Sequence, residues 1–182
     1  MKENTTEKKN TVWRAVVEWI TAFVVVLAFF FLLNTFVIVN AYVPSGSMEP
    51  TIETRSRMLG FRLTSLFREY ERGDIIIFRF PDDESQIFVK RIVGLPGDTV
   101  EIKEGSTYIN GEKYDETYLS VIPFNNDMGP WTVPEGCYFV MGDNRNSSND
   151  SRYWNNHFVS KDKVLGTAFF VYWPFSDFGT VQ

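Results

Sequence analysis

The most constraining feature of the sequence is an uncharged apolar run close to its beginning. From Ile20 to Val43 there are 24 consecutive residues without a charged side chain. As an α-helix this run is about 36 Å long, which exceeds the roughly 30 Å of hydrocarbon in a bilayer. No polar stripe interrupts its densest part, Phe23 to Leu33, so an amphipathic helix of a soluble domain is excluded. The run predicts a transmembrane helix over residues 20–43.

The alternative for this run is a cleaved secretory signal. Such a signal has a shorter apolar core that ends at a small-residue cleavage site, and neither the length of this run nor the residues after it fit that description. Lys8, Lys9 and Arg14 precede the run. Basic residues just before a membrane span favour the cytoplasmic side. They predict a cytoplasmic tail over residues 1–19, a single span in the cell membrane, and an extracytoplasmic domain over residues 44–182.

Composition limits the remaining possibilities. The chain of 182 residues, with 44% apolar content, accommodates one domain plus a short extra element. A charged content of 23% and a net charge of −5 argue against a disordered chain and against a nucleic-acid partner. The single Cys137 and the single His157 cannot build a disulfide or a multi-histidine metal site, so we expect no metal and no cofactor. The oligomeric state stays open.

After the run, short β-rich segments alternate with turn residues. Strands are expected at residues 74–80, 87–93, 137–141 and 164–173. Leu95-Pro96-Gly97-Asp98 predicts a type II turn, and Asn110-Gly111 predicts a two-residue hairpin loop. Only residues 64–71 read as a helix. The expected fold class is therefore mainly β, with an N-terminal transmembrane helix followed by an all-β domain.

Ser47 is a candidate nucleophile because it lies in a proline- and glycine-containing turn just after the apolar run. A serine nucleophile needs an unprotonated base within hydrogen-bonding distance. His157 lies in a polar, aromatic stretch without a GxSxG elbow, which favours a structural histidine. The lysines that follow the run, Lys90 apart, stand among acidic residues and read as solvated charges.

Lys90 differs from these lysines because strand alternation places it on one face with Phe88 and Ile92. Burial on that face would favour the neutral amine that a general base requires. The alternative is a lysine that extends to the rim of the sheet and has no chemical role. The strand pattern alone leaves both readings open.

The sequence resembles the bacterial type I signal peptidases, which are membrane-bound serine proteases. Four segments carry the resemblance, in order after one N-terminal span: Pro44-Ser45-Gly46-Ser47-Met48-Glu49-Pro50-Thr51, Arg72-Gly73-Asp74-Ile75-Ile76-Ile77-Phe78, Lys90-Arg91-Ile92-Val93-Gly94-Leu95-Pro96-Gly97-Asp98, and Gly142-Asp143-Asn144-Arg145-Asn146-Ser147-Ser148-Asn149-Asp150-Ser151-Arg152. Lysine rather than histidine at position 90 is similar to the bacterial form of the family. One segment departs from the family's pattern. A few residues after the stretch that matches Pro50-Thr51-Ile52, the family often has Gly-Asp, whereas this chain has Glu53-Thr54-Arg55-Ser56-Arg57.

The resemblance implies roles for individual residues. It makes Ser47 the nucleophile and Lys90 the general base, with Ser45 contributing to the oxyanion hole. Ser148 would orient the Lys90 amine. Four charged residues would support the site structurally: Asp143, Arg145, Asp150 and Arg152. Five apolar residues near the motifs are candidates for the substrate pocket: Val43, Met48, Ile52, Phe88 and Val89.

The resemblance also implies a reaction and partners. The expected reaction removes signal peptides of secreted preproteins at the lipid bilayer, cutting after small residues at the first and third positions before the cut. The peptide would bind as an added β-strand. Two alternatives remain, a self-cleaving Ser/Lys protease and a catalytically silent, membrane-anchored module that binds apolar peptides.

Overall fold

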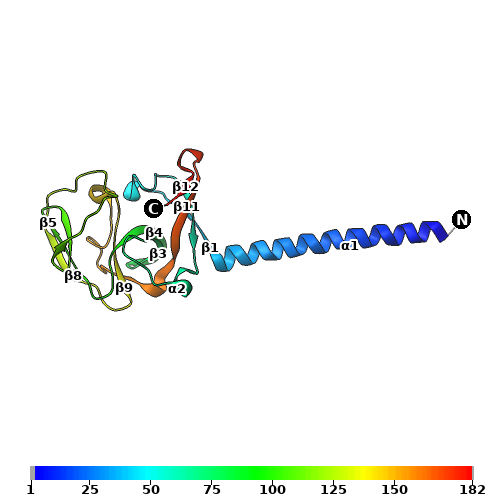
Figure 1. Cartoon of the computed structure of the whole chain (residues 1–182), viewed down its shortest axis with the longest axis horizontal. Coiled ribbons are helices and arrows are strands. Elements are labelled where there is room, and N and C mark those ends of the chain that lie inside the picture. Colours follow the sequence, from blue (N-terminus) through cyan, green and yellow to red (C-terminus); the bar gives the residue numbers. More distant parts are fainter. Residues whose placement is uncertain (1–2, 182) are drawn as a thin grey trace. The chain divides into compact units, whose positions relative to one another are not determined.

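The structure, a computed structural model, describes residues 3–181, with side chains from Trp13 onward (Figure 1). The chain divides into two compact units, Met1–Val37 and Ile38–Gln182. The first unit is helical: α1 spans Glu3–Leu32 and continues into one π-helical turn, η1, at Leu33–Val37. The second unit is built almost entirely of antiparallel strands. The prediction of an all-β domain after an N-terminal helix is confirmed.

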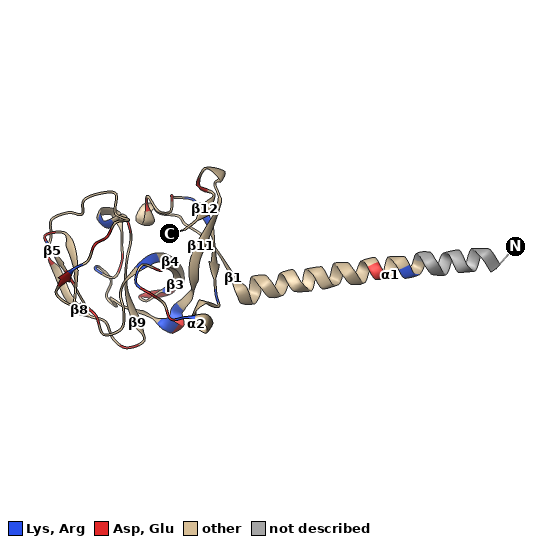
Figure 2. Cartoon of the chain, in the orientation of Figure 1, with Lys and Arg blue, Asp and Glu red and all other residues tan. Residues whose placement is uncertain are grey.

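The first unit has the features of a membrane span. Trp13–Val37 is long and apolar enough to cross a bilayer, and none of this stretch is buried within the protein. After Glu18 the helix carries no charged side chain (Figure 2). The side chains of Lys8 and Lys9, on which the predicted orientation depends, lie outside the described residues.

The helical segment ends earlier than predicted. We expected helix to Val43, but residues 38–42 form strand β1, Ile38–Tyr42, which pairs with β2, Arg57–Phe61. The β-branched residues Ile38 and Val39 favour extended backbone. Val39 is also buried in the core of the β domain, and this burial stabilises the strand. Composition alone could not separate an apolar strand from the helix that precedes it.

The second unit contains two sheets. The larger has the order β1-β2-β11-β3-β4-β9-β10, with β12 paired to β11, and the smaller has the order β7-β6-β5-β8. The remaining strands of the larger sheet are β3 (Ile75–Phe80), β4 (Asp83–Gly94), β9 (Cys137–Met141), β10 (Val159–Ser160), β11 (Val164–Trp173) and β12 (Gly179–Thr180). The smaller sheet consists of β5 (Thr99–Lys103), β6 (Ser106–Ile109), β7 (Glu112–Lys113) and β8 (Met128–Thr132).

Short helical turns connect the strands. They are α2 (Thr64–Phe67) and the 3-10 turns η2 (Gly46–Met48), η3 (Arg145–Ser147), η4 (Lys161–Lys163) and η5 (Phe175–Asp177). The helix predicted for residues 64–71 is thus limited to one turn. At Arg68 the backbone leaves the helix and becomes extended. The Arg68 guanidinium donates to the Asp74 carboxylate at 2.7 Å.

Both predicted turns are confirmed. Gly97 has a φ of 84°, and the Asp98 N–H donates to the Leu95 carbonyl at 3.0 Å, as a type II turn requires. Asn110 and Gly111 have φ values of 53° and 86° and join β6 to β7 as a type I′ loop.

Candidate active site

Ser47 lies on the turn η2, which is separated from the end of β1 by Val43, Pro44 and Ser45. Only 6% of Ser47 is exposed. Asn144 holds this turn from the other side of the site: its backbone N–H donates to the Ser47 carbonyl and its side-chain amide donates to the Gly46 carbonyl, both at 3.1 Å. Two consecutive carbonyls of the turn are therefore fixed by one residue, which limits the positions that the Ser47 hydroxyl can take.

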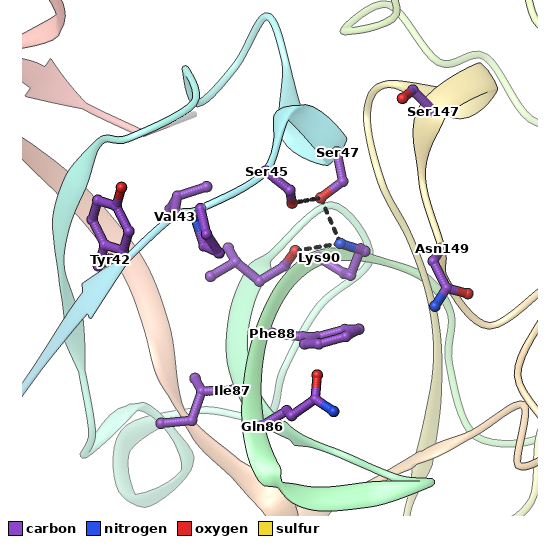
Figure 3. Close-up of a pocket in the computed structure, with 12 residues that line it drawn as sticks. Tyr42, Val43, Ser45, Ser47, Gln86, Ile87, Phe88, Lys90, Ser147 and Asn149 are labelled. Atoms are coloured by element: carbon purple, nitrogen blue, oxygen red, sulfur yellow. Dashed lines mark hydrogen bonds between the residues drawn. The ribbon is translucent and has the colours of Figure 1, made fainter.

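Lys90 reaches Ser47 from β4. Its amine Nζ lies 2.7 Å from the Ser47 Oγ and 3.1 Å from the Val89 carbonyl oxygen (Figure 3). Only 4% of Lys90 is exposed. Of the two readings left open by the strand pattern, the buried lysine is therefore the one realised.

Burial also sets the protonation of Lys90. Removal of the ammonium from water lowers the pKa of Lys90 from 10.5 to about 8, although the carboxylates of Asp150 and Asp143 raise it in part. The Lys90 Nζ also lies 5.4 Å from the centre of the Phe88 ring, a contact that favours the ammonium. Desolvation outweighs these effects, so a substantial fraction of the amine is neutral at mildly basic pH.

Two further serines flank the pair. The Ser45 hydroxyl donates to the Ser47 Oγ at 3.4 Å, so it lies on the same side of the turn (Figure 3). The Ser148 hydroxyl is buried and has no hydrogen-bond partner among the described residues. A neutral amine that accepts from Ser47 and donates to Val89 has one N–H left to donate, and an unpaired hydroxyl is a suitable acceptor for it.

The four predicted supporting charges are all buried and all paired. Arg152 donates to Asp150 at 2.8 Å, and Asp150 also accepts from the Gly142 N–H at 2.9 Å. Asp143 pairs with Arg91 at 2.7 Å, and the Thr51 hydroxyl donates to the same carboxylate at 2.5 Å.

Arg145 pairs with a residue that the sequence did not indicate. Its guanidinium makes two hydrogen bonds to the Glu116 carboxylate, one of them 2.7 Å long, and a third to the Thr107 hydroxyl at 3.0 Å. Glu116 lies in the long connection between β7 and β8, so this pair ties that connection to the loop that carries Ser148. No short motif surrounds Glu116, and only the three-dimensional structure brings it to Arg145.

An open pocket of about 450 Å³ adjoins the Ser47 and Lys90 side chains. Its lining consists of Tyr42, Val43, Pro44, Ser45, Ser47, Gln86, Ile87, Phe88, Val89, Lys90, Ser147 and Asn149. Three of the five predicted pocket residues are therefore part of the lining: Val43, Phe88 and Val89. Met48 and Ile52 are fully buried and pack in the core cluster beneath, together with Val43 and Val89.

Several lining residues were missed from sequence. Gln86 and Ile87 come just before Phe88 in β4, and the continuity of the strand could have indicated them. Ser147 and Asn149 lie beside Ser148 in the last motif, which was read only for its catalytic and charged members.

The remaining titratable candidates lie elsewhere. The ring nitrogen Nδ1 of His157 is 2.6 Å from the Ser151 carbonyl, and the ring packs 5.6 Å from that of Trp131. This is the structural role that its sequence context favoured. Lys103 pairs with Glu101 at 2.7 Å on the surface, in line with a solvated charge.

A serine hydroxyl held against a buried amine, beside an open pocket, is typical of the serine hydrolases. This class agrees with the comparison with known proteins, in which the family model described as "Signal peptidase, peptidase S26" matches residues 16–173. The chain therefore belongs to the signal peptidase family and, with it, to the serine proteases.

Two relatives support this membership by sequence identity, and a solved structure is also similar in sequence. A probable signal peptidase I-2 from Synechocystis sp. is 42% identical over 137 residues, covering 72% of this chain and 62% of that protein. Signal peptidase I of Bacillus licheniformis is 42% identical over 144 residues, covering 74% of this chain and 76% of the relative. A crystal structure of a signal peptidase I from Enterococcus faecalis is 39% identical and covers 55% of this chain and 97% of that chain, with a TM-score of 0.47.

Proposed function

We propose that the protein is a membrane-anchored serine endopeptidase with a Ser47–Lys90 catalytic pair, and that it removes N-terminal signal peptides from exported preproteins. The observation that carries the proposal is the 2.7 Å contact between the Lys90 amine and the Ser47 hydroxyl, made by a lysine whose pKa burial lowers to about 8. A base of this pKa is available for proton transfer near physiological pH.

The reaction follows from the positions of these groups. Neutral Lys90 takes the proton of the Ser47 hydroxyl as Oγ attacks the scissile carbonyl, and the oxygen of the tetrahedral intermediate accepts from the Ser47 N–H and the Ser45 hydroxyl. The ammonium of Lys90 then returns the proton to the leaving amine. Water, deprotonated by the same amine, hydrolyses the ester on Ser47. During the reaction the Ser148 hydroxyl, which has no partner among the described residues, would accept the remaining N–H of Lys90 and so position the amine.

Two strand segments with free edges favour an extended substrate. In the described sheet β1 pairs only with β2, and β4 pairs with β9 only from Arg91 onward, so residues 86–90 have one unpaired edge. The pocket lies between Tyr42–Val43 and this part of β4. A peptide strand placed there gains backbone hydrogen bonds and directs alternate side chains into the pocket. Phe88 and Val89 limit the depth, which favours small residues at the first and third positions before the cut.

The membrane topology belongs to the same proposal. With residues 1–19 in the cytoplasm, the single span delivers the β domain to the extracytoplasmic side of the cell membrane. Ser47 follows Val37 by ten residues, so it lies within about 35 Å of the end of the span along the chain. A preprotein is held in the same bilayer by its own apolar segment, and this confinement raises the effective concentration of the cleavage site. The four buried charges, Asp143, Arg145, Asp150 and Arg152, keep the site rigid.

The test is cleavage of a preprotein by the full-length protein in detergent micelles, analysed by mass spectrometry. The wild type should release the signal peptide, and Ser47→Ala and Lys90→Met should each lower kcat by at least about a thousandfold, since removal of a nucleophile or base abolishes the covalent route. Matched controls replace exposed residues of the same types, Lys103→Met and Ser85→Ala, and should cleave normally. Undiminished cleavage by the Ser47→Ala variant would refute the proposal.

A further inference from the structure

The long connection between β7 and β8, residues 114–127, carries an exposed apolar tip. Residues 117–126 contain no charged side chain, and the exposed fractions of Val121, Ile122 and Phe124 are 62%, 89% and 68%. None of these three belongs to a core cluster of the described residues. Exposed apolar side chains that are grouped, rather than scattered over a surface, mark a binding site. We refer to residues 121–124 as the apolar tip.

The backbone of the apolar tip is fixed from two sides. The Asn146 side chain, from the turn η3, accepts from the Phe124 N–H at 2.8 Å and donates to the Ile122 carbonyl at 3.1 Å. On the other side, the Gly105 N–H donates to the Asn126 carbonyl at 3.1 Å. A Cβ at Gly105 would lie 2.7 Å from the Phe124 carbonyl oxygen, so the turn between β5 and β6 packs directly against the tip. A loop that is already ordered loses little conformational entropy when it binds a partner.

The same connection is anchored on the catalytic motifs. The centre of the Tyr118 ring lies 4.1 Å from the guanidinium carbon of Arg91, the residue after Lys90. Two residues before Tyr118, Glu116 pairs with Arg145 of the last motif. The apolar tip therefore belongs to the frame of the active site.

Asn146 also joins the apolar tip to the substrate pocket. Its neighbour Ser147 lines one end of that pocket, and Gln86 and Ile87 line the other, with the Lys90 amine between them (Figure 3). The step from Ser147 to Asn146, the Asn146 side chain and one hydrogen bond together measure about 10 Å, which about three residues of extended chain cover.

The path of a bound preprotein follows from this arrangement. If its signal peptide lies along residues 86–90, as proposed above, the chain after the cut leaves past Ser47 on the side of Ser147. That side leads to Asn146 and the apolar tip. The mature chain, rather than a lipid surface, is therefore the occupant that the position of the tip favours.

We propose that the apolar tip is a docking site for the mature part of the preprotein, and that it takes an apolar side chain about three to six positions after the cut. This inference rests on the proposed function and narrows its substrates. The contact lies away from the bond that is cut, so it strengthens the binding of substrate and transition state alike. Such a contact lowers KM and leaves kcat unchanged.

The experiment compares two versions of one preprotein that differ only at positions three to six after the cut, which are leucine in one version and serine in the other. The full-length protein in detergent should cleave the leucine version with a kcat/KM about five- to tenfold higher, because leucine side chains lose contact with water at the tip. The difference should lie in KM.

The variants locate this preference. The combined variant Val121→Ser, Ile122→Ser and Phe124→Ser should bring the ratio of the two kcat/KM values to about one, and Ile122→Ser alone should lower the ratio at least about twofold. The matched control, Leu66→Ser with Phe67→Ser, removes apolar side chains that are equally exposed elsewhere and should keep the wild-type ratio. Because the readout is a ratio, a general loss of folded protein does not move it.

The outcomes separate the two proposals. If the wild type cuts both versions equally well, or if the combined variant keeps the wild-type ratio, the docking site is refuted while the proposed function stands. If the combined variant loses activity on both versions equally when phospholipid vesicles replace detergent, the tip contacts lipid and the docking site is again refuted. If the wild type cuts neither version, the proposed function fails and the docking site fails with it.

Discussion

The amine of Lys90 lies 2.7 Å from the hydroxyl oxygen of Ser47, although the two residues are 43 positions apart in the chain. One comes from the turn after β1 and the other from the middle of β4, and both are at least nine-tenths buried. A lysine in this position can accept the serine proton only when it is neutral. In the proposed mechanism the protonation of this one side chain therefore governs the activity, and its burial links the same protonation to the stability of the protein.

Activity should rise with pH between about 7 and 9. With the pKa of Lys90 at about 8, roughly a tenth of the amine is neutral at pH 7 and roughly nine-tenths at pH 9, so kcat/KM should rise about tenfold. The measurement is the initial rate of preprotein cleavage across this range, with circular dichroism as a control for folding. A flat profile, with acyl transfer rate-limiting, contradicts Lys90 as the base.

Lys90→Met should stabilise the protein at neutral pH. Below about pH 8 the folded state holds a desolvated ammonium, and a pKa lowered from 10.5 to about 8 corresponds to a cost of about 3 kcal/mol. Between pH 8 and 10.5 the unfolded state binds more protons than the folded state, so wild-type stability rises and the advantage of the variant shrinks. Urea unfolding at pH 7 and pH 10 measures the difference. Lys103→Met, at an exposed lysine, should show no such pH-dependent gain.

The β4 strand illustrates what the sequence could predict. Alternation along residues 87–93 placed Lys90 and Phe88 on one apolar face, and the structure buries the lysine there. The hairpin at Asn110-Gly111 was equally predictable, because its loop needs two positive φ angles that these residues adopt. Both features depend on local backbone geometry.

Features that depend on distant partners could not be predicted. The Glu116 side chain is buried against Arg145, 29 positions away in the chain. Met48 follows the nucleophile and was expected in the pocket, yet its side chain points into the core. Strand β1 was hidden inside an apolar run, since a buried strand and a membrane span share the same composition.

Ser148→Ala should lower activity without lowering stability. The Ser148 hydroxyl is buried and unpaired among the described residues, so its removal relieves an unsatisfied polar group and should leave the free energy of unfolding equal or slightly higher. The structure shows no hydrogen bond between Lys90 and Ser148, but in the proposed mechanism the neutral amine donates its second N–H to this hydroxyl, so kcat should fall by about ten- to a hundredfold with KM little changed. Steady-state kinetics and urea unfolding on the same preparation test both parts. A parallel loss of stability would indicate a purely structural serine.

Glu116→Ala should destabilise the protein strongly. The Arg145 side chain is 2% exposed and that of Glu116 is 6% exposed, so the substitution leaves a buried guanidinium without its carboxylate. Breaking a buried pair in this way costs about 3–5 kcal/mol. Glu112→Ala, at an exposed strand position, is the matched control and should change stability by less than about 0.5 kcal/mol. In urea unfolding, the double variant Glu116→Leu with Arg145→Met should lose less free energy of unfolding than Glu116→Ala alone.

Gly46→Ala should impair catalysis through the Glu49 side chain. Glu49 bonds Thr54 and its carboxylate covers Gly46, where a Cβ would lie 2.8 Å from the Glu49 Cδ. Thr54 holds this carboxylate in place, so part of the clash is relieved by a shift of the turn between Ser45 and Ser47, and kcat should fall by up to about tenfold. Removing the obstructing group in the double variant Gly46→Ala with Glu49→Ala should restore part of the lost kcat, because the nearest atoms all belong to that side chain. The matched control is Gly179→Ala, because an added Cβ there has no atom within 4 Å. This variant should leave the rate of cleavage unchanged in the same assay. Failure of the second substitution to recover any activity would show that the backbone of the turn, and not Glu49, excludes a side chain at position 46.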